Sequence, residues 1–304
     1  MSALASAMAD YLGVRRALGY KLVEAGRVLP RFVTHLDAQG TATVTVDSAL
    51  AWASETGRGA GVARRLQAIR GFALYLQALD PAHEVPPAGL VPDRSRRAVP
   101  RLYSDAEIVV LMAAARDLDP SLRAATTEAV IGVLAVTGMR IGEVLALNVA
   151  DVDWDTGVVT VWLAKFNKSR HVPLAPTALD ALVEYRRMSR LLAPDATMPA
   201  LFVGPRGRRL SYHGFATAFA DAVGATGLCA PSGRARIHGF RHSFAVSTLL
   251  GWYRDGADVH ALLPRLSTYL GHVSPASTYW YLSAAPELLA VAAERLDRIR
   301  EAGR

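Results

Sequence analysis

Residues 127–147, T-E-A-V-I-G-V-L-A-V-T-G-M-R-I-G-E-V-L-A-L, contain two apolar segments separated by a glycine. The first segment is apolar on nearly all sides, which predicts a helix buried in the core of a packed domain. Gly138 interrupts this pattern, and a second helix is predicted to begin at Arg140 or Ile141. The stretch therefore predicts two successive helices joined at a glycine.

The pattern changes in residues 151–174, D-V-D-W-D-T-G-V-V-T-V-W-L-A-K-F-N-K-S-R-H-V-P-L. The β-branched residues of V-V-T-V-W favour a strand, and a return strand is predicted at about 170–173. A turn is expected between the two, around Phe166 to Lys168. This segment predicts a β-hairpin or a small three-stranded antiparallel sheet.

Helical spacing of apolar residues returns after the predicted sheet. Helices are predicted at about 177–192, 212–225, 237–250, 257–271 and 286–300. The residues L-F-V-G, 201–204, suggest one extra short strand, and Pro264 is expected to break a helix. The predicted fold class is mainly α, of the α+β type, with one small antiparallel β-sheet.

Three regions are predicted along the chain. Residues 1–80 have helical spacing and predict a small bundle of about four helices. Residues 81–103 contain five prolines and several arginines, and they predict an interdomain linker because proline cannot continue a helix. The second domain, 104–304, opens with Ser104 and Glu107 at the spacing of a capping box, so a helix should begin there.

The composition allows a packed core and favours a polyanionic partner. Of the 304 residues 51% are hydrophobic, the net charge is +7 and the pI is about 9.8. Such a chain suits nucleic acid, although a basic, arginine-coding genome would leave a similar composition. Lysine occurs only at positions 21, 165 and 168, so Lys165 and Lys168 stand out in an arginine-rich chain.

Cysteine and hydropathy bear on the compartment. Cys229 is the one cysteine, which excludes an internal disulfide and a multi-cysteine zinc site and is typical of a reducing compartment. Neither a signal peptide nor a run of about 18 uncharged apolar residues is present. A cytoplasmic protein with no membrane partner is therefore expected.

Two of the eight histidines lie four residues apart in R-I-H-G-F-R-H, residues 236–242. His238 and His242 at this spacing could hold a metal, as in H-E-x-x-H sites, but the glutamate general base is missing. Arg241, a fixed cation, also disfavours a divalent metal. A phosphate suits this turn better, because arginine donors match phosphate oxygens in a bidentate way. The alternative is a helix N-terminus with a capped histidine.

Five motifs occur in one order between residues 137 and 281: T-G-M-R-I-G-E, A-K-F-N-K-S-R-H-V-P-L, H-G-F-R-H, L-G-H and S-T-Y-W-Y. Together they resemble the tyrosine recombinase, or phage integrase, family. The resemblance implies the fold of the DNA breaking-rejoining enzymes, with a helical core-binding (SAM-like) DNA-binding domain followed by the catalytic domain. The catalytic positions that it implies are Arg140, Lys165, His238, Arg241, His272 and Tyr281.

Two arginines suit the chemistry of phosphoryl transfer. Attack on a phosphodiester adds negative charge to its non-bridging oxygens, which Arg140 and Arg241 would stabilise. An ordinary i,i+3 ion pair with Glu143 is the alternative for Arg140. Both can hold, because the resemblance implies that the glutamate helps to position the arginine.

The departing sugar hydroxyl needs a proton, which a lysine can supply and an arginine practically never can. Lys165 is the candidate, and a solvated turn lysine is the alternative. The resembling family often has Gly-Lys-Gly where this chain has Ala164, Lys165 and Phe166, so the shape of the turn departs from the family's pattern.

The three histidines of these motifs have different expected roles. His238 and His272 would donate hydrogen bonds to the phosphate, and one of them would take the proton of the nucleophile. His242 would support its helix. A turn or core histidine is the alternative for His272.

Tyr281 is the expected nucleophile because it follows His272 by the nine residues that the family's pattern requires. Phenolate leaves readily from a phosphotyrosine ester, so DNA could be resealed without ATP. The arginines would supply the positive charge, and neither a metal nor another cofactor is expected. Tyr279 and Trp280 are expected to be packing or alignment residues.

The residues and the resemblance together predict a site-specific DNA recombinase that acts through a 3′-phosphotyrosyl intermediate in the integration, excision or transposition of a mobile element. The resemblance implies a homo- or hetero-tetramer on double-stranded DNA in the nucleoid. Companion recombinases could be among its subunits. Three alternatives stay open: a type IB topoisomerase, a non-cutting DNA-binding accessory protein and, third, an EDTA-sensitive metallohydrolase.

Further basic residues are candidates for contacts to DNA phosphates, with solvated charge as the alternative: Lys168, Arg94, Arg96 and Arg97. The amphipathic stretch 286–304 would either cover its own core or, as the resemblance implies, dock onto a neighbouring protomer. No chemical role is predicted for residues 249–268.

Overall fold

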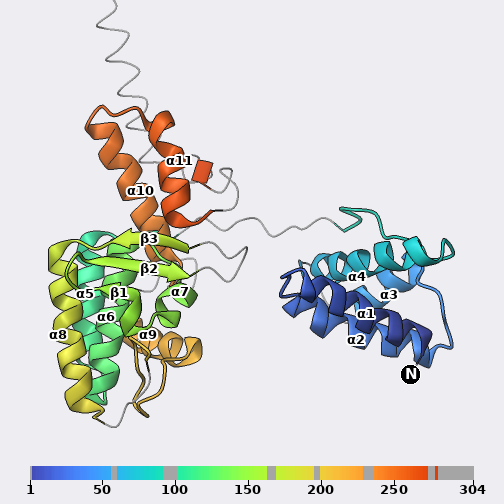
Figure 1. Cartoon of the computed structure of the whole chain (residues 1–304), viewed down its shortest axis with the longest axis horizontal. Helices are drawn as coiled ribbons and strands as arrows, with labels where there is room; N and C mark the ends of the chain where they lie inside the picture. The colour runs from blue at the N-terminus through green and yellow to red at the C-terminus, as the bar shows by residue number, and fades with distance from the viewer. Residues whose placement is uncertain are drawn as a thin grey trace, which may run out of the picture. The chain divides into compact units, whose positions relative to one another are not determined.

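The computed structural model describes residues 2–55, 60–91, 101–162, 169–194, 199–228, 236–272 and 278–279. The chain divides into two compact units, Met1–Ala98 and Val99–Arg304, which are drawn in Figure 1 and described one at a time below. Buried apolar clusters lie within each unit. Each unit therefore has a hydrophobic core of its own.

The described part of the first unit is a bundle of four helices, α1 (Ala3–Ala17), α2 (Val23–Ala38), α3 (Val46–Glu55) and α4 (Ala60–Leu79) (Figure 1). Helix α2 packs against the other three helices. Phe32 and Phe72 are completely buried, and the rings of Tyr11 and Phe72 lie 5.7 Å apart. The predicted number of helices in this region is confirmed.

The second unit opens with α5 (Asp105–Arg116), whose start confirms the predicted capping box. The Ser104 hydroxyl accepts a hydrogen bond from the Glu107 N–H, and the Glu107 carboxylate accepts one from the Ser104 N–H. Three longer helices follow, α6 (Ser121–Thr137), α8 (Pro176–Leu192) and α9 (Tyr212–Thr226). Helix α6 packs against α5, α8, α9 and α10, which explains why its stretch from Ala129 to Val136 is apolar on nearly all sides.

Helix α6 ends at Gly138, as predicted. This residue has a φ of +59°, a conformation that side chains with a Cβ rarely adopt. An added Cβ would also lie 2.6 Å from Cδ1 of the Phe244 ring. Glycine therefore permits both the turn and the close packing, and α7 (Ile141–Ala146) begins directly after Arg140.

The predicted hairpin is part of a three-stranded antiparallel sheet in the order β1-β2-β3, with strands β1 (Val152–Asp153), β2 (Val158–Trp162) and β3 (Ser169–Pro173) (Figure 1). A 3₁₀ turn, η1 (Val149–Asp151), precedes it. Val161 of β2 pairs with Arg170 of β3, and Val159 pairs with Val172. Arg170 and Val172 are the buried residues of β3, so an arginine faces the interior. The turn predicted at 166–168 lies outside the described residues.

The extra strand predicted at L-F-V-G, residues 201–204, is wrong. Val203 makes only an isolated antiparallel bridge to Arg209. The chain turns back tightly here, with the Gly204 N–H bonded to the carbonyl oxygen of Arg208 at 2.8 Å. Leu201, Phe202 and Val203 are apolar because they are buried in the core of the unit, which explains why their sequence resembled a strand.

Helices α10 (Gly239–Arg254) and α11 (Val259–Leu270) pack on each other through a separate apolar cluster (Figure 1). Pro264 lies inside α11 and does not break it, contrary to the prediction. Proline removes one backbone donor on the exposed side of this helix, while Leu263 and Leu266 are buried and hold it against its neighbours.

The predicted fold class is confirmed, since the described structure is mostly helical with a small antiparallel sheet. The helix predicted at 286–300 lies outside the described residues. Within the described ranges, none of the helices combines the length and the apolarity needed to cross a membrane.

Candidate active site

Arg140 lies where the turn after α6 becomes α7. Its main-chain N–H donates to Oε2 of Glu143 at 3.0 Å, and its Nη1 donates to Oε1 of the same carboxylate at 2.8 Å. Its Nη2 donates to the carbonyl oxygen of Gly271 at 2.9 Å. The side chain is nevertheless 39% exposed. The ion pair weighed as an alternative is thus present, and it holds a guanidinium that still faces solvent in part.

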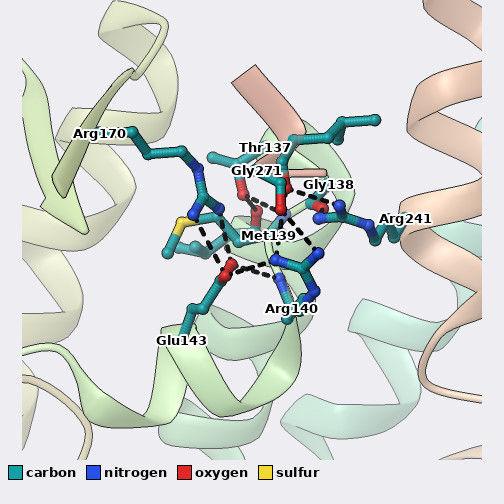
Figure 2. Close-up of polar contacts among 10 residues, drawn as sticks. Thr137, Gly138, Met139, Arg140, Glu143, Arg170, Arg241 and Gly271 are labelled. Carbon is teal, nitrogen blue, oxygen red and sulfur yellow. Dashed lines mark hydrogen bonds and ion pairs between the residues drawn. The ribbon is translucent and has the colours of Figure 1, made fainter. Parts of the chain in front are cut away.

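Arg241 comes from the first turn of α10 and is only 2% exposed. Its Nη1 donates to the carbonyl oxygen of Gly138 at 2.9 Å, and its Nη2 donates to that of Leu270 at 2.6 Å. A buried cation is costly unless its donors are satisfied. Arg241 therefore joins the turn after α6, the start of α10 and the end of α11 (Figure 2).

The end of α11 holds both arginines through main-chain atoms. A helix C-terminus leaves carbonyl groups without helical partners and carries partial negative charge. The Leu270 carbonyl accepts from Arg241, and the Gly271 carbonyl accepts from Arg140. Gly271 has a φ of +66° and ends the helix, so that His272 follows immediately. The L-G-H motif thus contributes two backbone acceptors as well as its histidine.

Glu143 lies between two guanidiniums (Figure 2). Besides Arg140, Arg170 of β3 donates from Nη1 to Oε1 at 3.2 Å and from Nη2 to Oε2 at 2.7 Å. Burial raises the pKa of the Glu143 carboxyl, but the hydrogen bonds and charges of Arg170 and Arg140 outweigh it and hold this pKa below its ordinary value. The carboxylate therefore stays ionised at neutral pH.

We call Arg140, Glu143, Arg170 and Arg241 the arginine cluster. It holds three guanidiniums and one carboxylate, so it carries excess positive charge. Positive charge concentrated beside a partly exposed guanidinium attracts an anion. The cluster can therefore bind a phosphate or another oxyanion at Arg140.

His238 and His272 lie in the electric field of the arginine cluster. Burial lowers the pKa of His238, and the charges of Arg241 and Arg140 lower it further. Burial, followed by the charges of the same two arginines, lowers the pKa of His272 to about 4. Both imidazoles are therefore neutral at neutral pH and able to accept a proton.

The predicted supporting residue His242 lies one helical turn beyond His238. The two imidazole rings are 4.6 Å apart and meet edge to face at 90°. This packing limits how far the His238 ring can turn. The role of His242 in supporting the helix stays a prediction.

Thr278 orients His272. Its hydroxyl oxygen lies 2.6 Å from Nδ1 of the imidazole, and the threonine is completely buried. A hydrogen bond at one ring nitrogen sets the direction of the other. The next residue, Tyr279, is 45% exposed. Its predicted role in packing or alignment stays a prediction.

Sequence reasoning missed Arg170 and Thr278. Alternation along β3 could have revealed Arg170, because it shares a face with the apolar Val172 and a buried arginine needs an acceptor. No comparable pattern singles out Thr278, since a hydroxyl six residues after a histidine is common.

The structure thus brings together four of the predicted catalytic residues, Arg140, Arg241, His238 and His272, with the predicted supporting Glu143. The other predicted site residues lie outside the described residues: Lys165, Lys168, Tyr281, Arg94, Arg96 and Arg97. Among the side chains that are described, no group of three His, Cys, Asp or Glu residues could hold a metal ion.

Comparison with known proteins gives consistent matches. The family described as "Phage integrase family" matches residues 101–287. A Sinorhizobium fredii protein named "Putative integrase/recombinase y4rB" is 40% identical over 98% of this chain and 98% of its own length. "Tyrosine recombinase XerC" of Herpetosiphon aurantiacus is 31% identical over 89% of this chain and 87% of its own.

The fold also matches a solved structure, that of the Tn1549 transposon integrase in complex with transposon right end DNA. The TM-score is 0.67 at 16% identity, and the match covers 96% of this chain and 99% of the other. At this identity the likeness is one of fold.

Proposed function

The chain belongs to the phage integrase family of tyrosine-type site-specific recombinases, and from this premise we propose that it cuts and rejoins duplex DNA through a 3′-phosphotyrosyl intermediate. The observation that carries the proposal is the convergence of Arg140 and Arg241 on the end of α11, beside His238 and His272. The chemistry of this group suits the pentacovalent transition state of phosphoryl transfer.

The arginine cluster supplies charge where the transition state develops it. Nucleophilic attack increases the negative charge on the non-bridging oxygens, and donors already held in position stabilise that charge without reorganising. Arg140 is fixed by Glu143 and by the Gly271 carbonyl, and it is exposed enough to meet a phosphate. Arg241 adds a second fixed cation next to it.

The hydroxyl oxygen of Tyr281 attacks phosphorus, and its proton passes to a neutral imidazole of His272 or His238. The bond from phosphorus to the 5′ oxygen breaks, and Lys165 gives that oxygen a proton. We propose these roles for Tyr281 and Lys165 because of their positions in the sequence motifs.

Rejoining reverses these steps. A 5′ hydroxyl of the partner strand attacks the phosphotyrosyl bond, and the phenolate of Tyr281 leaves. Each step replaces one phosphodiester bond by another, so the reaction needs no ATP. The guanidiniums supply positive charge that a metal would otherwise supply, so the reaction proceeds without one.

Double-stranded DNA is the proposed partner, with four protomers on two sites in a homo- or hetero-tetramer that acts on a mobile element. The net charge of +7 supports binding to DNA. The Tn1549 transposon integrase, which has a similar fold, has a solved structure in complex with transposon right end DNA, and this supports the proposal of the same partner and setting for this chain. The proposed DNA-binding unit is the helical region 1–80, and Lys168, Arg94, Arg96 and Arg97 stay candidates for phosphate contacts.

Covalent trapping tests the proposal. The wild type and the Tyr281→Phe variant are incubated in EDTA with labelled DNA from the flanks of the gene, nicked so that the intermediate accumulates, and run on denaturing gels. A protein–DNA band is expected from the wild type and from the matched control Tyr279→Phe, but not from Tyr281→Phe. This result would identify Tyr281 as the nucleophile, and because EDTA is present it would show that cleavage needs no divalent metal.

Other results have distinct meanings. A band that persists in Tyr281→Phe and vanishes in Tyr279→Phe would transfer the nucleophile to Tyr279. A wild type that binds the DNA but forms no band would favour a non-cutting accessory protein. Relaxation of supercoils without strand exchange between two sites would favour a type IB topoisomerase.

A further inference from the structure

Arg170 contributes to the arginine cluster from a different element than the predicted catalytic residues. It lies on β3, with 8% of its side chain exposed, and Glu143 is 11% exposed. Arg140, on the other side of the same carboxylate, is 39% exposed. The carboxylate of Glu143 therefore has an inner partner, Arg170, and an outer partner that faces solvent (Figure 2).

The inner pair has the geometry that fixes a carboxylate most firmly. Two guanidinium nitrogens of Arg170 donate to the two oxygens of Glu143, at 3.2 and 2.7 Å. Such a two-pronged pair sets the plane of the carboxylate as well as its position. Arg140 then bonds to an oxygen whose direction has already been set.

Arg170 also lies against the end of α11. A Cβ at Gly271 would be 2.9 Å from Nη1 of Arg170 and 3.3 Å from its Cζ. The Gly271 carbonyl accepts the second bond of Arg140, at 2.9 Å. Arg170 thus bonds to one of the groups that hold Arg140, the Glu143 carboxylate, and lies beside the other, residue 271.

Charge gives Arg170 a second effect. A carboxylate shared by two guanidiniums neutralises neither of them fully, so Arg140 retains attraction for a phosphate. Without Arg170, Glu143 would be left to Arg140 alone, and one positive charge would be lost from the cluster. The charge of Arg170 also contributes to lowering the pKa of His272, so it acts on a predicted catalytic residue.

We propose that Arg170 is a positioning residue for DNA cleavage, which holds the Glu143 carboxylate so that the Arg140 guanidinium meets the scissile phosphate at a fixed angle and with undiminished charge. The inference rests on the proposed function. A purely structural ion pair, which would stabilise the fold and nothing more, is the competing explanation.

The test compares two substrates that differ in charge at the scissile position. Replacing the scissile phosphate by a methylphosphonate removes the negative charge that Arg140 would stabilise. Arg170→Gln should slow single-turnover cleavage of the phosphate substrate by about 10²-fold, as expected for a misplaced catalytic group. On the methylphosphonate substrate the same variant should lose less than about threefold, because the missing charge leaves little for Arg140 to stabilise.

Arg209→Gln is the matched control. Arg209, a half-buried arginine that precedes α9, donates to the carbonyl oxygens of Leu145 and Leu147 at the end of α7, at 2.9 Å each. None of its hydrogen bonds involves the arginine cluster. Its replacement should therefore reduce cleavage of both substrates by the same factor, through stability alone.

A second variant guards against misfolding of Arg170→Gln. Arg170→Lys keeps the buried positive charge and with it the fold, but a single ammonium group cannot bond both carboxylate oxygens in parallel. It should show a smaller loss that is still confined to the phosphate substrate. Melting curves of both variants establish that the assays are made on folded protein.

Equal losses on the two substrates, for Arg170→Gln and Arg170→Lys alike, would overturn the positioning role and leave a structural ion pair. Wild-type rates in a folded Arg170→Gln would overturn it as well. These outcomes require a wild type that cleaves. A wild type that cleaves neither substrate would instead overturn the proposed function, and the positioning role with it.

Discussion

At the scale of single residues, Arg140 and Arg241 differ in burial and in hydrogen-bond partners, and therefore in what they can do in the site. Arg241 is buried and bonded to main-chain carbonyls of Gly138 and Leu270, so it fixes the surrounding segments as well as supplying charge. Arg140 is 39% exposed and is bonded to Glu143 and to the end of α11. The division follows from burial, because a buried guanidinium must satisfy its donors within the protein.

The histidines give a prediction about pH. The pKa of His272 is lowered to about 4, first by burial and then by the neighbouring arginines, from an ordinary value of about 6.5. As the pH falls below about 6.5, the unfolded chain takes up a proton at this residue and the folded chain does not until about 4. Stability should therefore fall as the pH falls through this window.

Urea unfolding at pH 7.5 and pH 5 of the wild type and His272→Gln measures this effect. The glutamine variant has no titrating group at this position, so acidification should cost it less stability than it costs the wild type. An identical loss of stability in both proteins would show that the His272 pKa is not lowered in the fold.

At the scale of elements, the turn after α6 decides where Arg140 and Arg241 meet. Gly138 combines a positive φ with contact to the Phe244 side chain, and its carbonyl binds Arg241. Any change in this turn therefore alters the junction of α6, α7 and α10 together.

Gly138→Ala should destabilise the protein by about 2–4 kcal/mol, the sum of left-handed backbone strain and overpacking against Phe244. DNA cleavage should fall too, since the Gly138 carbonyl holds Arg241. Gly142→Ala is the matched control in the same segment, because a Cβ there meets nothing within 4 Å. It should be neutral or stabilising by up to about 1 kcal/mol, through helix propensity.

Thermal unfolding compares these two variants with the wild type. If Gly138→Ala melted like Gly142→Ala, the turn would have another conformation available that tolerates a side chain, and the packing against Phe244 would not limit it.

At the scale of the whole molecule, the two units have separate cores. Among the residues that the structure describes, the buried apolar cluster of the first unit runs from Leu4 to Leu76, and the buried clusters of the second unit begin at Tyr103. We therefore expect each core to form without the other. Net positive charge, in contrast, belongs to the whole chain and suits both units to one polyanionic partner.

Phe32→Ala should consequently unfold one unit selectively. Phe32 is completely buried in the first unit, and its truncation should cost that unit about 3–5 kcal/mol. In calorimetry of the full chain, one transition should shift down and the other should stay unchanged. Residues 1–98 and 99–304, expressed apart, should reproduce the two transitions. A single transition that moves as a whole would contradict independent folding.

Much of this molecule follows from local rules in the sequence. Periodic apolar spacing predicted the helices, Ser104 and Glu107 predicted the start of α5, and β-branched residues predicted the hairpin. The family resemblance rested on motif order, and it is confirmed. Two local predictions were wrong, at Pro264 and at 201–204, because burial in the core overrode what the residue types favour in isolation.

The tertiary structure alone decided how the site is held. Arg140 bonds to residue 271 and Arg241 to residue 138, across 131 and 103 positions of the chain, and in both cases the acceptor is a main-chain carbonyl. Every residue has such a carbonyl, so no side-chain pattern reveals which ones accept. The sharing of Glu143 with Arg170 likewise depends on β3 lying beside α7. Residue types along the chain thus determine which groups can act, and packing determines which acceptors hold them, because only folding brings distant main-chain and side-chain atoms within hydrogen-bond distance.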